Sequence, residues 1–350
     1  MSSFTGQLRS NEIFAALYNM IISQEVFADN IGNHQTLVDK ARVDGGLFGD
    51  TKLYYSTDVL KSAAWGNDAE AANLLSLHRP KAPEVQAIHL DVFRQIALTV
   101  DEYLSKRAWG TSDAFSSFNS VMTGWINETK KIYEGTSYNV FIGTTKSSEA
   151  NQNKTVTLSG TNDGQVLAEY IANLISELGD YSRDFNDYKQ LRSYKPGDLK
   201  FIWNIKYVNK IKKVDLPTIF HKDGLVDKLD EDSLPARYFG TVNGAVTAAN
   251  NDGTLRSVYE KDFTKSGVVT HCFPGDLIPS NIAIESGDSY TEDDKVICKV
   301  LVKLPPYMSS FSVATSFYNP KSLTENKYLT FGHNTLEYLK GYPYITIKKA

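Results

Sequence analysis

The sequence predicts an α+β fold in which long helices and runs of strand occupy separate stretches of the chain. Apolar residues recur at helical spacing in two segments, residues 115–132 and 166–178. Residues 85–100 alternate as a long strand does. Further strands are predicted at 296–304, 309–317 and 342–347. With 350 residues, 41% of them hydrophobic, the chain can bury a large core without disulfides or metals.

The chain begins with a polar segment that is expected to lead into a short helix. Residues 1–10 are polar, and Asn11 is suited to cap a helix over residues 12–24. The apolar side chains of this helix recur at helical steps: Ile13, Phe14, Leu17 and Ile21. This start of the chain is therefore interpreted as an arm.

Two extended limbs are predicted between residues 41 and 100. Residues 52–56 form a short strand after a cluster of glycines, and residues 85–100 form the long strand. Between them, two prolines in the segment 78–83 interrupt regular structure. We interpret the two limbs as a β-arm that projects from a body.

The clearest helix is predicted at residues 113–134. Thr111, Ser112 and Asp113 are N-cap candidates, and Gly135 is expected to end the helix. At 1.5 Å per residue the helix is about 33 Å long. Its apolar stripe is expected to pack against the body of the fold. The packing residues are Phe115, Phe118, Met122, Trp125 and Ile132.

The second half of the chain alternates between helix, strand and turn. A polar loop over 144–164 precedes the helix 166–178, which Gly179 closes. A short strand over 199–204 leads into a basic helix over 207–213. Residues 218–295 are rich in glycine, asparagine and aspartate, and predict turns.

Composition excludes several classes of function. The 41 acidic and 37 basic side chains give a charge of −4, which disfavours the wrapping of nucleic acid by bulk electrostatics. Two cysteines are too few for a disulfide scaffold or a structural zinc site. No secretory signal and no stretch long enough to span a membrane are seen. The 20 tyrosines and 17 phenylalanines suggest extensive contacts with partners.

A search for catalytic patterns finds no metal, cofactor or nucleotide motif. Neighbours on a strand point to opposite faces, so the adjacent His271 and Cys272 are not expected to share a metal. Two carboxylate clusters could in principle serve glycoside hydrolysis. They are Asp227, Asp230, Glu231 and Asp232, and Glu292, Asp293 and Asp294. Both lie in turn-rich sequence, where a solvated loop is the competing interpretation. We therefore do not expect an enzyme.

The order of elements resembles the major capsid protein of tailed bacteriophages, which has the Hong Kong 97-type fold. The similarity is greatest to small short-tailed phages. Four segments of the chain carry the resemblance. They look like the end of the extended loop, the spine helix, the axial strand with its helix, and the tail that returns to the peripheral domain. In this sequence they are 95–109, 115–133, 199–213 and 317–344.

The resemblance implies a division of the chain into an arm, a loop and two domains. Residues 1–40 would form the N-terminal arm, and residues 41–110 the extended loop. The peripheral domain with its spine helix would comprise 111–164 and 305–350. The axial domain would comprise 165–304, with an insertion at 220–295.

The resemblance also implies a function. The protein would self-assemble into pentamers and hexamers of an icosahedral head that encloses double-stranded DNA without sequence-specific binding. Ile13, Phe14, Leu17 and Ile21 would then belong to an inter-subunit arm. Scaffolding, portal and decoration proteins would be partners, and no membrane would be involved. The protein would assemble in the bacterial host cytoplasm and reside in the virion.

Three alternatives remain open at this point. An encapsulin-type compartment shares the fold but encloses protein cargo. A carboxylate-dependent glycoside hydrolase would use the clustered acids. Another structural virion protein, such as a tail or head-fibre component, would assemble with a different symmetry.

Overall fold

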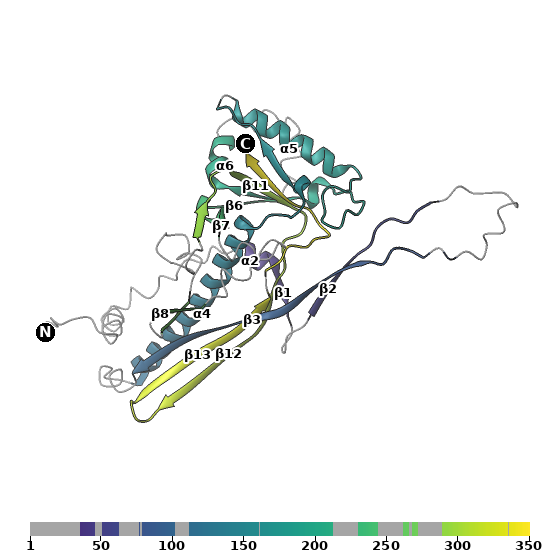
Figure 1. Ribbon diagram of the computed structural model, residues 1–350. Helices are drawn as coiled ribbons and strands as arrows, with labels where there is room; N and C mark the ends of the chain where they lie inside the picture. Colours follow the sequence, from purple (N-terminus) through teal and green to yellow (C-terminus); the bar gives the residue numbers. More distant parts are fainter. Residues whose placement is uncertain are drawn as a thin grey trace. The chain divides into compact units, whose positions relative to one another are not determined.

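A computed structural model of the chain is shown in Figure 1. It describes residues 36–45, 51–62, 77, 79–101, 112–160, 162–212, 230–243, 262–265, 268–271, 289–334 and 336–350. The predicted helix over 12–24, with Ile13, Phe14, Leu17 and Ile21, lies outside the described residues.

The chain divides into two compact units. Within the described residues, the first unit contains 93–101, 112–135 and 312–331, together with Thr36. The second unit contains the described parts of 37–92, 136–311 and 332–350. Four elements continue from one unit into the other. They are β3 (Glu84–Asp101), α4 (Ser112–Thr144), β12 (Tyr307–Asn319) and β13 (Thr324–Asn334).

The first unit combines one helix with three neighbouring strands in the order β12-β13-β3. Helix α4 packs against β13 through Tyr133, whose ring meets that of Phe331 edge to face at 5.7 Å. The guanidinium of Arg94 on β3 lies 5.7 Å from the Tyr133 ring centre. From Phe93 to Val100 the side chains of β3 alternate between exposed and buried or half-buried, so the buried positions face this contact.

Helix α4 differs from the prediction in its end and in the face that it buries. It does not end at Gly135 but continues to Thr144, because residues 136–144 pack into the core of the second unit. A glycine inside a helix costs only about 1 kcal/mol, which this packing offsets.

The buried stripe of α4 includes Ile126 and Tyr133, not Trp125, whose indole is 39% exposed. The side chain of Ile132 is half-buried, and those of Phe115, Phe118 and Met122 lie outside the described part of the chain. The predicted stripe is therefore wrong at Trp125 by one helical position, or about 100° around the helix axis.

The second unit is built on a five-stranded sheet in the order β4-β14-β11-β5-β6. Its strands are β4 (Asn153–Val156), β14 (Tyr344–Lys349), β11 (Val296–Leu301), β5 (Lys200–Asn204) and β6 (Asp230–Leu234). The central strand β11 is buried at every position and runs antiparallel to both neighbours. The outer pairs, β14 with β4 and β5 with β6, are parallel.

Each face of this sheet carries its own hydrophobic core. Phe201 and Trp203 pack with α5 (Asp163–Gly179) and α6 (Ile205–Lys212), which cover one face. Ile202, between them on β5, points to the other face and packs with Tyr138 and Phe141 of α4 and with α2 (Thr36–Ala41). The period of two along β5 thus separates the two cores.

The remaining described elements are short. Strands β1 (Arg42–Asp44) and β2 (Thr51–Ser56) pair with β12 and β3. There are two further two-stranded antiparallel sheets. One pairs β7 (Gly240–Asn243) with β10 (Ser289–Glu292), and the other pairs β8 (Asp262–Lys265) with β9 (Val268–His271). Single 3-10 turns occur at Ala150–Gln152, Pro196–Asp198 and Ala236–Tyr238.

One lysine lies at the centre of the main sheet. The side chain of Lys299 on β11 is fully buried, and its Nζ donates to the Thr145 carbonyl (2.6 Å) and to Thr346 Oγ1 (2.9 Å). Burial, and then the nearby charges of Lys146 and Lys348, hold the pKa of Lys299 well below its ordinary 10.5. A neutral amine offers two N–H donors, and both are used here.

This burial predicts a specific pH dependence of stability. Unfolding exposes Lys299, which takes up a proton at any pH between its lowered folded pKa and 10.5. The stability that Lys299 provides should therefore rise with pH across this window, by about 1 kcal/mol per pH unit. Urea unfolding of the unassembled protein at pH 7.5, 8.5 and 9.5 should show this gain relative to Lys299→Met. Lys146 and Lys348 are present in both proteins, so parallel pH curves would contradict the assignment.

Candidate assembly surface

The strands β2 and β3 form a two-stranded ribbon with one bound face and one exposed face. On the bound face, Ile88 packs with Met308 and Leu339. Gln86 donates from its amide to the Tyr338 carbonyl (3.0 Å) and accepts from the Lys340 N–H (3.0 Å). These contacts fix which face of the ribbon is turned to the subunit, because neighbouring residues on a strand point to opposite faces.

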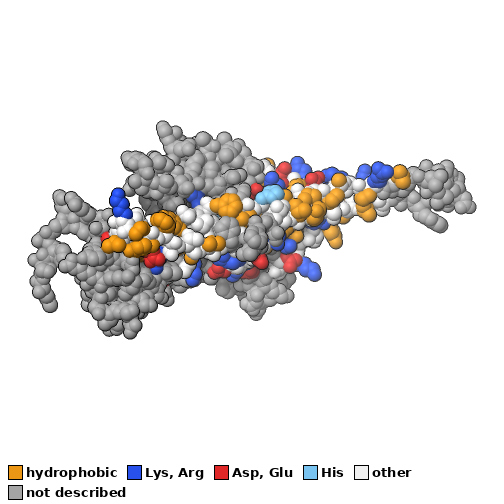
Figure 2. All heavy atoms as spheres, turned by 90° about the horizontal axis from the view of Figure 1, so that it is seen from below, with side chains coloured by type: hydrophobic (Ala, Val, Ile, Leu, Met, Phe, Trp, Pro, Cys, Tyr) orange, Lys and Arg blue, Asp and Glu red, His pale blue; other side chains and the backbone are white. Residues whose placement is uncertain are grey.

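The opposite face of the ribbon is apolar and exposed. In the antiparallel register, Leu53 lies opposite Ala87 and Tyr55 lies opposite Val85. Leu53 is 49% exposed, Tyr55 65% and Val85 46%. Figure 2 shows apolar side chains gathered on the right-hand part of the molecule, where this ribbon lies, with charged groups mainly at the margins. An exposed cross-strand apolar cluster of this kind is typical of surfaces that contact another molecule.

The apolar character continues into the segments beyond both strands. Val59, Leu60 and Leu77 are each more than half exposed. We call the set Leu53, Tyr55, Val59, Leu60, Leu77 and Val85 the ribbon surface. Sequence reasoning predicted the extended limbs but not this surface. Its signal was available in the alternation of Leu53 and Tyr55 with Lys52 and Tyr54.

Hydrogen bonds hold the root of the ribbon against residues 182–192. Asp58 accepts from Arg183 Nη1 (2.6 Å) and from the Leu191 N–H (3.1 Å). Arg192 donates to the Thr57 carbonyl (2.5 Å), and Ser56 bonds the Gln190 side chain. The hydrogen bond from Arg183, followed by those from backbone N–H groups, holds the pKa of Asp58 well below its usual range.

Removing this carboxylate is expected to loosen the root of the ribbon. In Asp58→Ala the Leu191 N–H loses its acceptor, so its hydrogen exchange should accelerate at least about 10-fold. The effect should fade below about pH 4, since the stabilisation from a carboxylate with a lowered pKa is lost as it becomes protonated. Lys81→Ala, which removes an exposed ion pair with Glu84, is the control and should leave exchange at Leu191 unchanged. Unaltered exchange in Asp58→Ala would show that the carboxylate does not hold the root.

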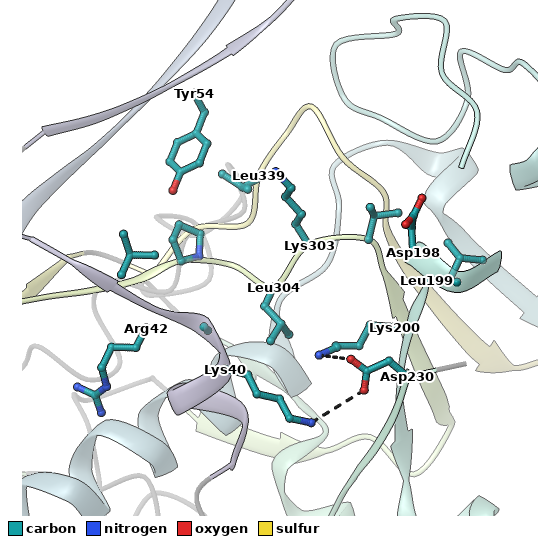
Figure 3. A pocket seen from close by; sticks show the side chains of 15 residues that line it. Lys40, Arg42, Tyr54, Asp198, Leu199, Lys200, Asp230, Lys303, Leu304 and Leu339 are labelled. Carbon is teal, nitrogen blue, oxygen red and sulfur yellow. Dashed lines mark ion pairs between the residues drawn. The ribbon is translucent and has the colours of Figure 1, made fainter. Parts of the chain in front are cut away.

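A pocket of about 420 Å³ lies in the second unit, between α2, β1, β2 and the start of β5. Figure 3 shows Lys40 and Lys200 pointing toward Asp230, while Arg42 points away. Lys200 Nζ lies 2.6 Å from the Asp230 carboxylate, and Lys40 Nζ lies 3.9 Å from it. Lys40 also bonds Asp232 at 2.9 Å, and this hydrogen bond raises the pKa of Lys40.

The first carboxylate cluster therefore has a structural role that the sequence did not indicate. Asp230, Glu231 and Asp232 lie on strand β6 rather than in a solvated loop, so that expectation was wrong. Asp230 and Asp232 are counter-ions that connect β6 to the lysines of α2 and β5. Asp227 lies outside the described residues.

The second cluster is also engaged by lysines. Asp293 bonds Lys348 of β14, and Asp294 lies 2.7 Å from Lys206 of α6. Glu292 is the last residue of β10. Asp293 and Asp294 are thus ion-pair partners of lysines on β14 and α6.

The remaining sequence features of interest are the histidines, the two cysteines and the helices. No three His, Cys, Asp or Glu side chains converge there as a metal site would require. Cys298 is a free, fully buried thiol whose pKa burial raises, as expected of a core cysteine. His271 lies on β9, but the structure does not describe its side chain, and Cys272 lies outside the described residues. None of the described helices is long and apolar enough to cross a membrane.

Comparison with known proteins identifies the fold. No protein-family model and no curated protein matches the sequence. The chain is similar to one in the capsid structure of Staphylococcus phage Andhra, with a TM-score of 0.64 and 10% identity, over 93% of this chain and 86% of that one.

Two further solved structures support this result. One is the structure of the head fibre and inner core protein of bacteriophage P68, with a TM-score of 0.58 and 10% identity over 86% of this chain and 81% of that one. The other is the mature capsid of bacteriophage PhiM1, with a TM-score of 0.51 and 6% identity over 100% of this chain and 92% of that one. These similarities confirm the α+β class and the resemblance to the Hong Kong 97-type fold of tailed-phage capsid proteins.

Proposed function

We propose that this protein is the major capsid protein of a tailed bacteriophage. The observation that carries the proposal is the similarity to the Andhra capsid structure along 93% of the chain. The solved structures that the chain resembles are phage assemblies.

The ribbon surface supports self-assembly independently of the comparison. A monomer gains nothing from a two-stranded ribbon with exposed leucine, valine and tyrosine side chains, because exposed apolar area is unfavourable in water. When a neighbouring copy covers it, the exposed part of each large side chain contributes about 1 kcal/mol. Since every copy would present and receive the same contact, modest contacts add up to a stable shell.

The proposal extends to the organisation of the particle. The protein would form pentamers and hexamers of an icosahedral head around double-stranded DNA, and its charge of −4 suits a wall that does not grip DNA tightly. The division into arm (1–40), extended loop (41–110), peripheral domain and axial domain belongs to this proposal. So do the arm residues Ile13, Phe14, Leu17 and Ile21, assembly in the host cytoplasm, and scaffolding, portal and decoration proteins as partners.

A second function is favoured by one observation. The P68 structure to which the chain is similar is described as one of head fibre and inner core protein. A head-fibre or inner-core role would keep the phage particle as the setting but change the symmetry. The encapsulin-type and glycoside hydrolase alternatives receive no such support from the comparisons.

Electron microscopy of the purified protein, alone and coexpressed with the scaffolding protein of its phage, tests the proposal. Rings of five and six subunits or closed icosahedral shells are expected. Fibres, or rings of another fixed symmetry, would favour the head-fibre function. A monomer under every assembly condition would contradict a shell role.

A further inference from the structure

The outer half of β12, residues 312–319, has an edge that no described strand covers. β1 pairs with β12 only at Tyr307, Met308 and Ser309. Beyond them, β12 has β13 on one side and, within the described residues, no strand on the other. Figure 1 shows β12 at the margin of its sheet. Such an edge presents a row of main-chain N–H and C=O groups that can pair with another chain.

The side chains along this edge are uncharged and exposed. The segment reads Ser-Val-Ala-Thr-Ser-Phe-Tyr-Asn, and residues 312–318 are exposed on both faces of the strand. Val313 is 47% exposed and Phe317 62%. Natural edge strands are commonly protected by a lysine, a proline or a bulge. Here the first proline and the first charge come only at Pro320 and Lys321, beyond the strand.

The direction of the main-chain groups follows from the inner half of β12. The Ser309 carbonyl points to the β1 side, where it accepts from the Gly45 N–H (2.9 Å). The Met308 N–H points to the β13 side, where it donates to Asn334 Oδ1 (2.7 Å). Because these directions alternate along a strand, Val313, Thr315 and Phe317 turn their N–H and C=O groups to the open edge.

We propose that this edge pairs antiparallel with the same edge of a second copy, with Thr315 opposite Thr315 across a twofold axis. This register is self-complementary. It places Val313 opposite Phe317 twice, on the same face as the central Thr–Thr pair. Aromatic–β-branched pairs and Thr–Thr pairs are among the favourable cross-strand combinations. The outward N–H and C=O groups of all three residues then bond between copies.

A second copy fits this edge better than a charged partner does. A twofold contact places each residue against its symmetry mate or near it, so like charges would repel, and residues 307–319 contain none. The inference deepens the proposed shell function by naming one twofold contact, and it rests on that function for its setting. The pairing itself needs only two copies of the chain.

Cysteine pairing tests the register. In the proposed register Ala314 lies opposite Ser316, in a non-hydrogen-bonded pair with Cα atoms about 4.5 Å apart, within disulfide range. The two variants are Ala314→Cys and Ser316→Cys, each in a Cys272→Ser background, and one of them carries a tag. Each variant alone and an equimolar mixture of the two are oxidised, both as free protein and after assembly. Only the mixture should give the disulfide dimer in high yield, at least about 10-fold above either variant alone. Equal yields in all three samples, or no dimer in any, would overturn the proposal.

A charge exchange at the twofold axis gives a second test. Thr315→Lys and Thr315→Glu should each weaken pairing at least about 10-fold in sedimentation, since like charges then face each other. Mixing the two variants should restore it. Thr315 is exposed, so both variants should unfold like the unaltered protein. Failure of the mixture to recover would count against the register.

The outcomes separate this inference from the proposed function. Shells that assemble without the mixture-specific disulfide would refute the β12 contact and leave the capsid function intact. A mixture-specific disulfide in a protein that forms only fibres or dimers would support the contact and refute the shell.

Discussion

Replacing both Leu53 and Tyr55 with aspartate is expected to weaken assembly at least about 100-fold while leaving the subunit folded. The two side chains are about half to two-thirds exposed, so their replacement changes little inside the subunit. At an interface the exposed part of each side chain contributes about 1 kcal/mol, and an aspartate buried in its place would add a desolvation penalty of about 1–3 kcal/mol or more. The protein concentration needed for assembly should therefore rise at least about 100-fold.

The measurement is sedimentation of particles over a protein concentration series, with circular dichroism to follow folding. Lys61→Asp is the matched control, because it also changes the charge by −2 at an exposed position close to the same ribbon. It should assemble at nearly the normal concentration. If the double variant assembled as readily as Lys61→Asp, the ribbon surface would not be an interface.

The elements that the sequence predicted well are those whose periodicity is dictated by a single buried face. β3 occupies Glu84–Asp101 where alternation predicted 85–100, and α5 ends at Gly179 as its stripe and glycine indicated. In both, one face is consistently covered, so the hydrophobic pattern carries the information.

The sequence failed where burial changes along an element or where polar residues pair with distant partners. In the first unit α4 buries Ile126 and Tyr133, and from residue 136 onward it packs into the core of the second unit, so no single stripe describes the helix. β6 begins Asp-Glu-Asp, which favours a loop by composition. It is a strand because Lys40 and Lys200, far away in the sequence, neutralise its carboxylates.

The candidate site was predictable in outline only. The two limbs of the ribbon are visible in the sequence, but which face is bound depends on Gln86 and Ile88 meeting residues about 250 positions later. A free strand edge, such as that of β12, is a property of sheet order and has no local signature.

Gly143→Ala is expected to be the most damaging glycine-to-alanine substitution among the described residues of the second unit. A Cβ at Gly143 would lie 2.0 Å from the Tyr238 carbonyl oxygen and 2.6 Å from its carbonyl carbon. Those are backbone atoms, so no side-chain rotation relieves the overlap, and α4 or the turn Ala236–Tyr238 must move. Tyr238 and its neighbour Phe239 both lie in the hydrophobic core that α4 joins, so movement there disrupts close packing. We expect a loss of about 3 kcal/mol or more in the free energy of unfolding.

Gly124 provides the matched comparison on the same helix. A Cβ there meets no atom of the described residues within 4 Å, so Gly124→Ala should gain the helix propensity of alanine without a clash. Its expected effect is a stabilisation of about 0.5–1 kcal/mol, opposite in sign to that at Gly143. Urea unfolding of the two variants under identical conditions separates the contributions, because the chemical change is the same and only the surroundings differ. If both variants gained stability, α4 would not pack closely against Ala236–Tyr238, and the buried position assigned to the C-terminal third of the helix would have to be abandoned.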